Sequence, residues 1–395
     1  MVLTTKQEQA LKIAIERFKN NEPYTCISGY AGAGKSTLIK FIISALGLNP
    51  EKEVAYCAFT GKAANVLKNK GCVGATTIHK LIYQAYQLKD GSFSYRLKQK
   101  LDEPYKIIVI DEISMVSQDL WEKLLSFKIH LLVTGDPEQL PPVMAEPNKV
   151  LQKPHIFLDE IMRQAQESEI IRLSMAIRNN QSLSPIKLNE IQIIDKDKLN
   201  TGMLLWADQI LCATNNTRIG INNQVRSLLG RGEVPEAEDK VISLHNHWQV
   251  CANNTYMPLT NGTIGNLRAP DKRYIKLPFY ISDKSIAYLF TNFYTEEGDI
   301  FQNLPIDYEQ LANGNKTLSA RQEYLLNKNK TFPYSAPMDF TYAYAITTHK
   351  AQGSEWSKVL VLEEGFPFNK EEHRRWLYTS VTRAKEKLVL IRNFN

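Results

Sequence analysis

Short continuous apolar runs alternate along this chain with longer stretches of helical periodicity. Continuous apolar runs are typical of parallel strands in a sheet that helices cover on both faces. In the first part of the chain we expect such strands at 24–28, 53–59, 106–110 and 129–134. Residues 1–150 are therefore predicted to form one α/β domain.

A second series of apolar runs suggests another α/β domain. Its expected strands are 156–158, 209–213, 341–347, 358–362 and 387–391. We assign residues 151–238 and 338–395 to this second domain.

Two segments interrupt the alternation of strands and helices. Within 83–104, an Asp90-Gly91 turn lies between β-capable arms and predicts a hairpin inserted in the first domain. From 239 to 337, Asn-Gly pairs and abundant Tyr, Phe and Val predict a small β-rich insert in the second domain.

A phosphate-binding loop is the most specific local pattern. Residues 29–37 have the spacing G-x4-G-K-S and lie between an expected strand and an expected helix at 38–46. Backbone N–H groups of such a loop surround nucleotide phosphates at the positive end of the helix dipole. Lys35 would neutralise phosphate charge, and the Ser36 hydroxyl would bind Mg²⁺. The residues predicted to hold a nucleoside triphosphate are Gly29, Gly32, Ala33, Gly34, Lys35, Ser36 and Thr37.

Three polar residues that follow later strands add hydrolytic chemistry. Asp111 and Glu112 end the apolar run 107–110, which places them at the carboxyl edge of the sheet. Asp111 is expected to bind Mg²⁺ opposite Ser36, and Glu112 to act as general base on the attacking water. Gln139 follows the strand at 129–134 and can contact the γ-phosphate.

Composition changes this picture little. The net charge of +6 is compatible with a nucleic-acid partner but does not demonstrate one. The five cysteines are scattered, which argues against a disulfide framework and a zinc site. The first residues lack the apolar core of a signal peptide, and no apolar run reaches the length of a membrane span. We expect a cytoplasmic protein without a membrane partner.

With these motifs, the chain resembles a superfamily 1 DNA helicase of the 5′-to-3′ branch, similar to the RecD-like and phage Dda-like enzymes. The resemblance covers nearly the whole chain, because nine motifs occur in the family order. They are the Q motif at 3–7, motif I at 29–37, motif Ia at 59–64, motif Ib at 76–79, motif II at 111–112, motif III at 135–139, motif IV at 162–164, motif V at 347–353 and motif VI at 378–384. The resemblance implies two RecA-like P-loop domains, with ATP and Mg²⁺ bound in the cleft between them.

The resemblance also implies nucleotide contacts that spacing alone does not reveal. Gln7 corresponds to the adenine-reading glutamine, and Gly353 to a residue of motif V on the nucleotide side. Arg163 and Arg383 correspond to arginines that reach the γ-phosphate from the second domain, in the manner of arginine fingers. Hydrolysis would then require closure of the two domains.

Contacts with single-stranded DNA are implied by the same motifs. The residues concerned are Phe59, Thr60, Lys62, His79, Asn215, Thr348 and His349. Phe59 departs from the family, which usually has proline at this position. Its ring could stack on a base or pack beneath the loop.

The two interrupting segments match inserts of the family. The hairpin at 83–104 corresponds to a strand-splitting pin, in which Phe93 would stack against a fork. The segment 239–337 corresponds to an SH3-like β-barrel that guides single-stranded DNA. The resemblance therefore implies an ATP-dependent 5′-to-3′ DNA helicase that acts as a monomer on single-stranded and forked DNA, with replication or single-strand-binding proteins as candidate partners.

Other functions remain open at this stage. A translocase that strips proteins from single strands would share every ATPase motif, and an RNA helicase would differ only in contacts to the 2′-hydroxyl. A small-molecule kinase or a passive ATP-gated module is disfavoured by the second α/β domain and its Arg383.

Overall fold

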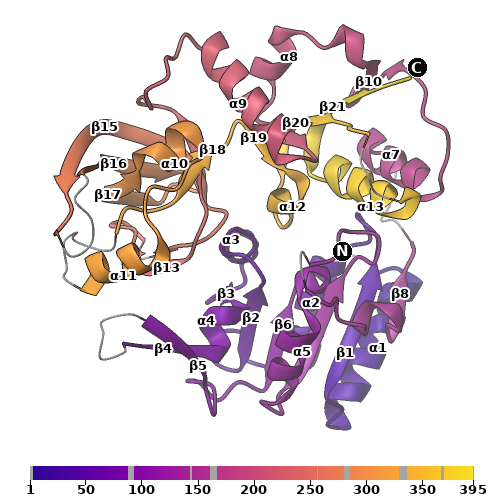
Figure 1. The fold of residues 1–395 in the computed structure, drawn as a ribbon. Coiled ribbons are helices and arrows are strands. Elements are labelled where there is room, and N and C mark those ends of the chain that lie inside the picture. Colours follow the sequence, from indigo (N-terminus) through magenta and orange to yellow (C-terminus); the bar gives the residue numbers. More distant parts are fainter. Residues whose placement is uncertain are drawn as a thin grey trace.

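The computed structural model describes residues 3–87, 93–142, 145–160, 167–255, 257–279, 285–328, 336–365 and 369–394. The described strands form two six-stranded sheets, one five-stranded sheet and two strand pairs. In Figure 1 the sheet of the N-terminal part lies below that of the C-terminal part, with the five-stranded sheet to one side. We call these the first sheet, the second sheet and the insert sheet. Among the described residues, no helix combines the length and the apolar character needed to cross a membrane.

The first sheet is parallel, with strand order β3-β2-β6-β7-β1-β8. Its strands are β1 (Tyr24–Gly29), β2 (Val54–Ala58), β3 (Thr76–Thr77), β6 (Ile107–Ile110), β7 (His130–Gly135) and β8 (Ile156–Leu158). The helices around it are α1 (Thr5–Lys19), α2 (Lys35–Ala45), α3 (Gly61–Asn69), α4 (Ile78–Ile82) and α5 (Gln118–Leu125).

Helices on both faces explain the continuous apolar runs of the first sheet. In β6, Ile107 and Val109 pack with α1, α2 and α3, whereas Ile108 and Ile110 pack with α4 and α5. Successive side chains of a strand point to opposite faces, and all four of these are at most 1% exposed. The predicted α/β fold with a doubly covered parallel sheet is therefore confirmed.

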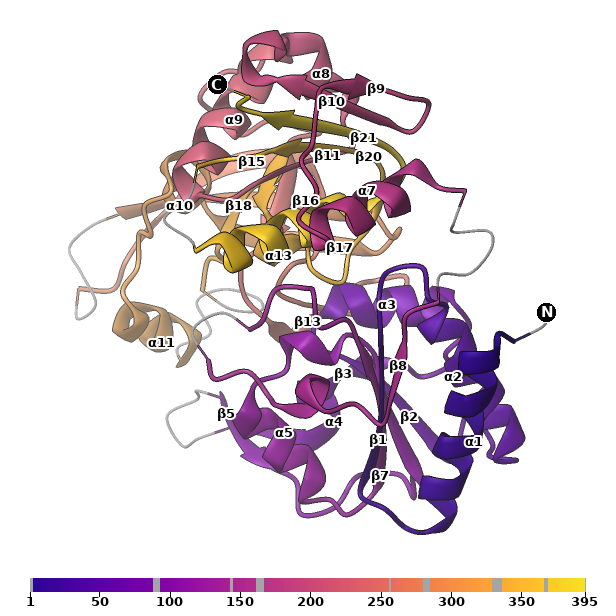
Figure 2. The same cartoon turned by 90° about the vertical axis from the view of Figure 1, so that its right-hand side faces the viewer.

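The second sheet has the order β19-β11-β20-β21-β10-β9, and β9 pairs antiparallel with β10. Its strands are β9 (Ile186–Lys187), β10 (Ile191–Asp195), β11 (Gln209–Cys212), β19 (Ala345–Thr347), β20 (Trp356–Leu362) and β21 (Ala384–Arg392). Its helices are α7 (Glu169–Arg178), α8 (Thr201–Trp206), α9 (Asn215–Leu228), α12 (Thr348–Ala351) and α13 (Lys370–Val381). Helices α7 and α13 cover one face, and α8 and α9 cover the other. Figure 2 shows α13 on the side of the second sheet that faces the first sheet.

The insert sheet is antiparallel, with strand order β17-β16-β15-β12-β18. We call residues 240–342, which contain it, the insert. Its strands are β12 (Lys240–Ser243), β15 (Ile264–Lys276), β16 (Ser285–Thr295), β17 (Ile300–Asp307) and β18 (Phe340–Tyr342). Also in the insert are the strand pair β13 (His247–Cys251) and β14 (Pro258–Leu259) and the helices α10 (Tyr308–Asn313) and α11 (Ala320–Lys328). Its core contains three fully buried phenylalanines: Phe293, Phe301 and Phe340.

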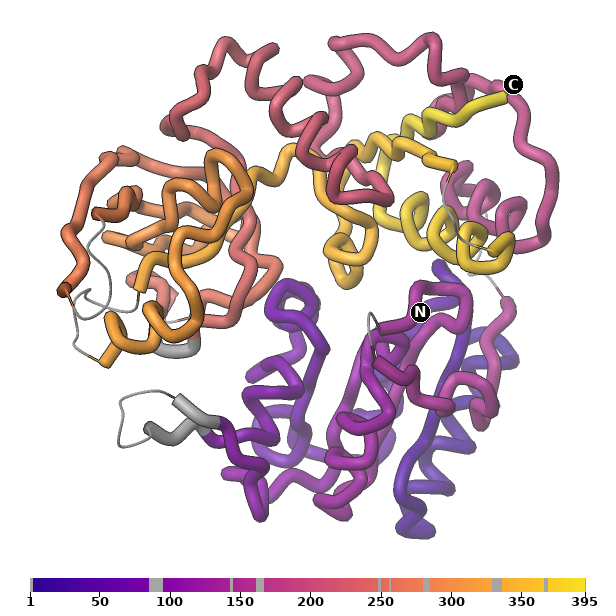
Figure 3. The backbone as a smooth tube through the Cα atoms, in the orientation of Figure 1, coloured from indigo at the N-terminus to yellow at the C-terminus, as the bar shows by residue number. Residues whose placement is uncertain are grey.

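A two-stranded hairpin follows α4. Strands β4 (Tyr83–Gln87) and β5 (Phe93–Leu97) pair antiparallel, as expected for the arms of the 83–104 segment. The Asp90-Gly91 turn lies outside the described residues. Figure 3 shows that the chain enters β4 on the side of the molecule where the insert lies.

Two apolar runs differ from their predicted placement. The strand 156–158, expected in the second α/β domain, is β8 and pairs with β1 at the edge of the first sheet. The run 341–347, expected as one strand, is divided between β18 of the insert sheet and β19 of the second sheet. An apolar run indicates a buried strand, but its pairing partner depends on contacts distant in sequence.

A buried charge network holds the insert where the chain enters and leaves it. Asp239 is fully buried, and its Oδ1 accepts hydrogen bonds from Arg226 Nε at 3.0 Å and Arg231 Nη1 at 2.7 Å. Tyr344, on the returning chain, donates its hydroxyl to the same oxygen at 2.9 Å. One carboxylate therefore connects both crossings between the second sheet and the insert.

Asp239→Asn is expected to destabilise the protein by about 3–5 kcal/mol, because Arg226 and Arg231 would lose the charge that compensates them. The measurement is urea unfolding followed by circular dichroism. Asp271→Asn is the control, since Asp271 forms an exposed pair with Arg273 and should cost less than about 1 kcal/mol. A similar loss of unfolding free energy in the two variants would contradict the role assigned to Asp239.

Candidate active site

The phosphate-binding loop connects β1 to α2 at the carboxyl edge of the first sheet. Gly32 and Gly34 have φ angles of 80° and 74°, a region that favours glycine, and this allows the loop to curl. Gly29 has no room for a side chain, because a Cβ there would lie 2.8 Å from an atom of β8. Lys35 Nζ donates to the carbonyls of Gly29 at 2.8 Å and Tyr30 at 3.0 Å. The lysine thus points back over the loop.

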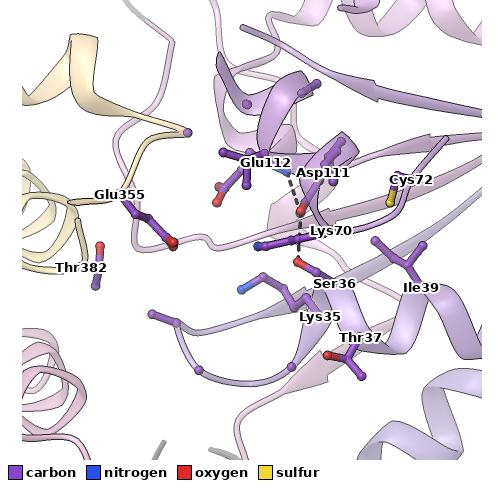
Figure 4. Close-up of a pocket in the computed structure, with 18 of the residues that line it drawn as sticks. Lys35, Ser36, Thr37, Ile39, Lys70, Cys72, Asp111, Glu112, Glu355 and Thr382 are labelled. Carbon is purple, nitrogen blue, oxygen red and sulfur yellow. Dashed lines mark hydrogen bonds between the residues drawn. The ribbon is translucent and has the colours of Figure 1, made fainter. Parts of the chain in front are cut away.

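Ser36 and Asp111 form a candidate Mg²⁺ site (Figure 4). Ser36 Oγ donates to Asp111 Oδ2 at 3.2 Å, and Thr134 Oγ1 donates to Asp111 Oδ1 at 2.6 Å. Mg²⁺ prefers oxygen ligands and commonly binds one or two protein groups together with substrate phosphates. The Ser36 hydroxyl, at the start of α2, lies beside the Asp111 carboxylate, and these two oxygen groups fit Mg²⁺.

Glu112 is held in a half-buried and strained position next to these groups. Its φ of 58° lies in the left-handed region, which is uncommon for residues other than glycine. Burial and the neighbouring Asp111 raise the pKa of Glu112, whereas Arg383 and Lys35 oppose that rise. Gln139 Nε2 lies 3.5 Å from Glu112 Oε1. Glu112 Oε2 and Gln139 Oε1 are buried and have no hydrogen-bond partner among the described residues, so both can serve a bound ligand.

Arg383 brings the second sheet to the same cavity. It is 4% exposed, and its guanidinium donates to the carbonyls of Thr379 at 3.1 Å and Ser354 at 3.3 Å. A cavity of about 590 Å³ brings together most of the predicted nucleotide residues. Its lining includes Gly32, Gly34, Lys35, Ser36, Thr37, Asp111, Glu112, Gln139, Gly353 and Arg383. Arg163 lies outside the described residues.

Tyr378 of α13 connects the second sheet to two loops of the first. Its hydroxyl accepts a hydrogen bond from Ala31 N–H at 3.1 Å and donates to Asp136 Oδ2 at 2.6 Å. Burial raises the pKa of Asp136. In the same loop, the Leu140 carbonyl accepts from Gln352 Nε2 at 2.8 Å. The phosphate loop and motif III therefore contact the second sheet directly.

Gln7 differs from the implied adenine contact. It is 1% exposed, its Nε2 donates to the Ala33 carbonyl at 3.1 Å, and its Oε1 accepts from Thr4 N–H at 3.1 Å. The second bond belongs to the capping box of α1. Gln7 thus contacts the loop residue Ala33 from beneath, and Gln7 is not among the residues that line the cavity.

A second cavity, of about 700 Å³, contains most of the implied DNA contacts, and we call it the groove. The implied residues that line it are Phe59, Thr60, His79, Asn215 and His349. Phe59 meets His79 edge-on with ring centres 5.8 Å apart, and His79 stacks with Tyr83 at 5.8 Å. Phe59 thus lines the groove while also packing against the core beneath it. Burial lowers the pKa of His79 and of His349, so both imidazoles are neutral at neutral pH.

Two residues implied as DNA contacts lie away from the groove. Lys62 is 8% exposed, and its ammonium pairs with Glu296 at 3.0 Å. Thr348 is fully buried, and its hydroxyl lies 2.8 Å from Ser380 Oγ. Neither residue is among those that line the groove, and both side chains make contacts within the chain. The side chain of Phe93, in β5, lies outside the described part of the chain.

Tyr83, Thr347 and Lys350 are among the groove-lining residues to which the sequence analysis gave no DNA contact. Tyr83 lies one helical turn after His79, a spacing that places the two rings on one face and could have been found from sequence. Lys350 places an amine in the groove. Burial and the nearby Arg218 lower the pKa of this amine.

Comparison with known proteins agrees with this geometry. A family described as an AAA domain matches residues 2–195, and a UvrD-like helicase C-terminal domain matches residues 342–391. The ATP-dependent RecD2 DNA helicase of Deinococcus radiodurans is 26% identical over 393 residues, which cover 91% of this chain and 46% of the relative. The ATP-dependent DNA helicase dda of Enterobacteria phage T4 is 28% identical over 179 residues, which cover 44% of this chain and 40% of the relative. The matches therefore span less than half the length of both relatives.

Solved structures of Pif1 helicases share the fold. A Pif1 structure describing unwinding at forked duplex DNA has a TM-score of 0.57 at 19% identity, covering 99% of this chain and 92% of that one. Bacteroides Pif1 in complex with ADP-AlF3 and single-stranded DNA has a TM-score of 0.55 at 18% identity, with the same coverage of 99% and 92%. The ordered motifs, the two matching domain families and these relatives agree, and the chain is similar to the ATP-dependent DNA helicases named RecD2, Dda and Pif1 and to the RecBCD enzyme subunit RecD.

Proposed function

We propose that this chain is an ATP-dependent DNA helicase that translocates 5′ to 3′ along single-stranded DNA and unwinds duplex DNA. The observation that carries the proposal is the nucleotide cavity, which is lined by the phosphate loop and carboxylates of the first sheet and by Arg383 of the second. A site shared between two sheets is complete only when they close on the nucleotide, which couples hydrolysis to motion.

In this proposal, ATP hydrolysis uses groups on both sides of the cavity. Lys35 neutralises phosphate charge from the loop, and Arg383 approaches the γ-phosphate from the opposite side. Glu112 accepts a proton from the attacking water, and Gln139 contacts the γ-phosphate beside it. Mg²⁺, when bound near Ser36 and Asp111, neutralises charge on the phosphate oxygens.

The groove is assigned to single-stranded DNA. Its aromatic residues Phe59, His79 and Tyr83 offer faces and edges on which bases can stack, and Lys350 offers a cation for a phosphate. Such contacts bind strands largely without sequence preference. The 5′-to-3′ direction is proposed from the family alone.

The domain roles are also part of the proposal. We assign the first and second sheets to RecA-like domains, the β4–β5 hairpin to a pin and the insert to an SH3-like barrel. Strand pairing favours extending the first domain beyond residue 150 to include β8, and the insert beyond residue 337 to include β18. We propose that the chain acts as a monomer on single-stranded and forked DNA, together with replication or single-strand-binding proteins.

Lys35→Ala should reduce ATP hydrolysis by at least about 10²–10³-fold, because the loop would lose its phosphate-neutralising cation. The measurement is steady-state phosphate release with and without single-stranded DNA. Lys12→Ala, at an exposed position of α1, is the matched control and should behave as the wild type. Hydrolysis in the wild type that is indifferent to DNA would refute a nucleic-acid motor, and stimulation by RNA alone would favour an RNA helicase.

Glu112→Gln should lower kcat by about 10²–10⁴-fold, because the amide cannot accept a proton from water. Burial raises the pKa of Glu112, and the carboxylate is the active form, so kcat should increase with pH up to and just above that raised pKa. The acid limb of the wild-type profile should therefore lie above the ordinary range of a glutamate. An acid limb at the ordinary glutamate pKa, or a Glu112→Gln variant with normal kcat, would refute this assignment.

Phe93→Ala should abolish unwinding of a forked duplex while translocation on single-stranded DNA continues, because the pin would lose the ring that stacks against the fork. Strand separation and displacement of a bound protein block are measured in parallel. Val73→Ala, an exposed position in the same domain, is the control. Normal unwinding by Phe93→Ala would remove the pin assignment, whereas a wild type that displaces proteins without unwinding would identify the translocase alternative.

A further inference from the structure

Glu296 lies in the turn between β16 and β17, where the insert meets both sheets. Its Oε1 is 2.7 Å from Lys240 Nζ, at the start of β12. Its Oε2 accepts hydrogen bonds from Lys62 Nζ of α3 at 3.0 Å and from Trp356 Nε1 of β20 at 3.2 Å. One carboxylate therefore contacts side chains from the first-sheet region, the second sheet and the insert. We call these four residues the three-way junction.

Lys62 is enclosed by the neighbouring residues of the three-way junction and by Glu297. Its ammonium lies 4.4 Å from the centre of the Trp356 ring and 3.9 Å from Glu297 Oε1. Cation–π and ion-pair attractions gain strength where water is excluded, and the Lys62 side chain is only 8% exposed. The lysine is thus committed to an intramolecular contact.

The Glu296 carboxylate stays ionised around neutral pH. Partial burial opposes ionisation of Glu296, yet the ammonium groups of Lys240 and Lys62 lower the pKa of Glu296 to about 2. The contact between Lys62 and Glu296 therefore depends on how the surrounding elements are placed, and not on protonation of Glu296.

Helix α3 connects the three-way junction to both candidate sites. Thr60 and Gly61, at its start, line the groove, whereas Ala63 lines the nucleotide cavity. Gly353 of motif V packs against the same helix, since a Cβ there would lie 2.8 Å from Ala63 Cβ. Movement of the second sheet relative to α3 must therefore change the Lys62 contact.

The junction also lies next to the arginine of the nucleotide cavity. Trp356 N–H donates to the Arg383 carbonyl at 3.0 Å. When the two sheets separate, Lys62 would leave with α3, while Lys240 would remain as the counter-charge of Glu296. The Glu296 side chain is 29% exposed, so water can replace the departing ammonium. The contact can consequently open and form again without leaving an uncompensated charge.

Building on the proposed function, we propose that Lys62 and Glu296 are positioning residues that hold α3 against Trp356 and the insert, and thereby favour the closed cleft in which Arg383 reaches the nucleotide. The insert then moves with the nucleotide state of the cleft.

The test compares Lys62→Met, Glu296→Gln and the double variant in the full chain. Each single substitution should raise the KM for ATP about tenfold at saturating single-stranded DNA, because the apparent affinity falls with the population of the closed state. The Kd for single-stranded DNA without nucleotide should stay within about twofold of the wild type, since the groove lining is unchanged. The double variant should match the single variants, because both substitutions break one contact.

Two further variants serve as controls. Glu297→Gln removes a neighbouring acid that lies farther from Lys62 and should change the KM by less than about threefold. Lys62→Arg keeps the charge and should recover most of the wild-type KM. Thermal unfolding of each variant checks that the fold is retained. If Glu296→Gln does not fold, the KM for ATP of Lys62→Met alone still tests the role of the contact.

Three outcomes would decide against a proposal. If Lys62 binds a DNA phosphate, Lys62→Met should weaken DNA binding and reduce the slope of log Kd against log salt concentration by about 0.7. Glu296→Gln should then leave DNA binding unchanged. This pair of results would overturn the inference. An unchanged KM for ATP in both single variants would overturn it as well. A wild type whose hydrolysis does not respond to single-stranded DNA would instead overturn the proposed function.

Discussion

Glu112 and Arg383 line one cavity from different sheets, and the attraction between their charges links the two sides of that cavity. Burial raises the pKa of Glu112, while Arg383 and Lys35 act against that rise. The first sheet supplies the phosphate loop, the carboxylates and the unpaired oxygens of Glu112 and Gln139. Of the two opposing cations, Lys35 belongs to that loop and Arg383 comes from the side of the second sheet, so the cavity is lined from both sides.

Polar contacts on both sides of this cavity join the two sheets. Tyr378 and Gln352 bind the loops of the first sheet on one side, and Lys62 meets Glu296 and Trp356 on the other. Hydrogen bonds and ion pairs of this kind can be exchanged for contacts with water at modest net cost, unlike a large apolar interface. An interface built from them suits the proposed opening and closing of the cleft, and residues at the start of α3 line both cavities.

Most of the fold could be predicted because its determinants are local. The apolar runs identified most strands of both α/β sheets, since strands covered on two faces need apolar side chains at successive positions. They did not identify β3, β9 and β10, which are short or carry polar residues. The placement of 156–158 and of 341–347 could not be predicted in the same way. Their apolar character shows burial, whereas their membership of a sheet depends on hydrogen bonds to strands far away in the chain.

The candidate site shows the same contrast between features set by local sequence and features set by distant contacts. The sequence by itself determined the phosphate loop at 29–37 and the Asp111–Glu112 pair, because their geometry follows from strand, loop and helix segments that are adjacent along the chain. Only the tertiary structure revealed the intramolecular contacts of Gln7, Thr348 and Lys62, which motif positions had assigned to ligands. Lys62 is paired with Glu296, 234 positions away, and such a partner becomes visible only after the chain has folded. Spacing along the sequence specifies local geometry, but the environment of a charged side chain is set by whatever the fold places beside it.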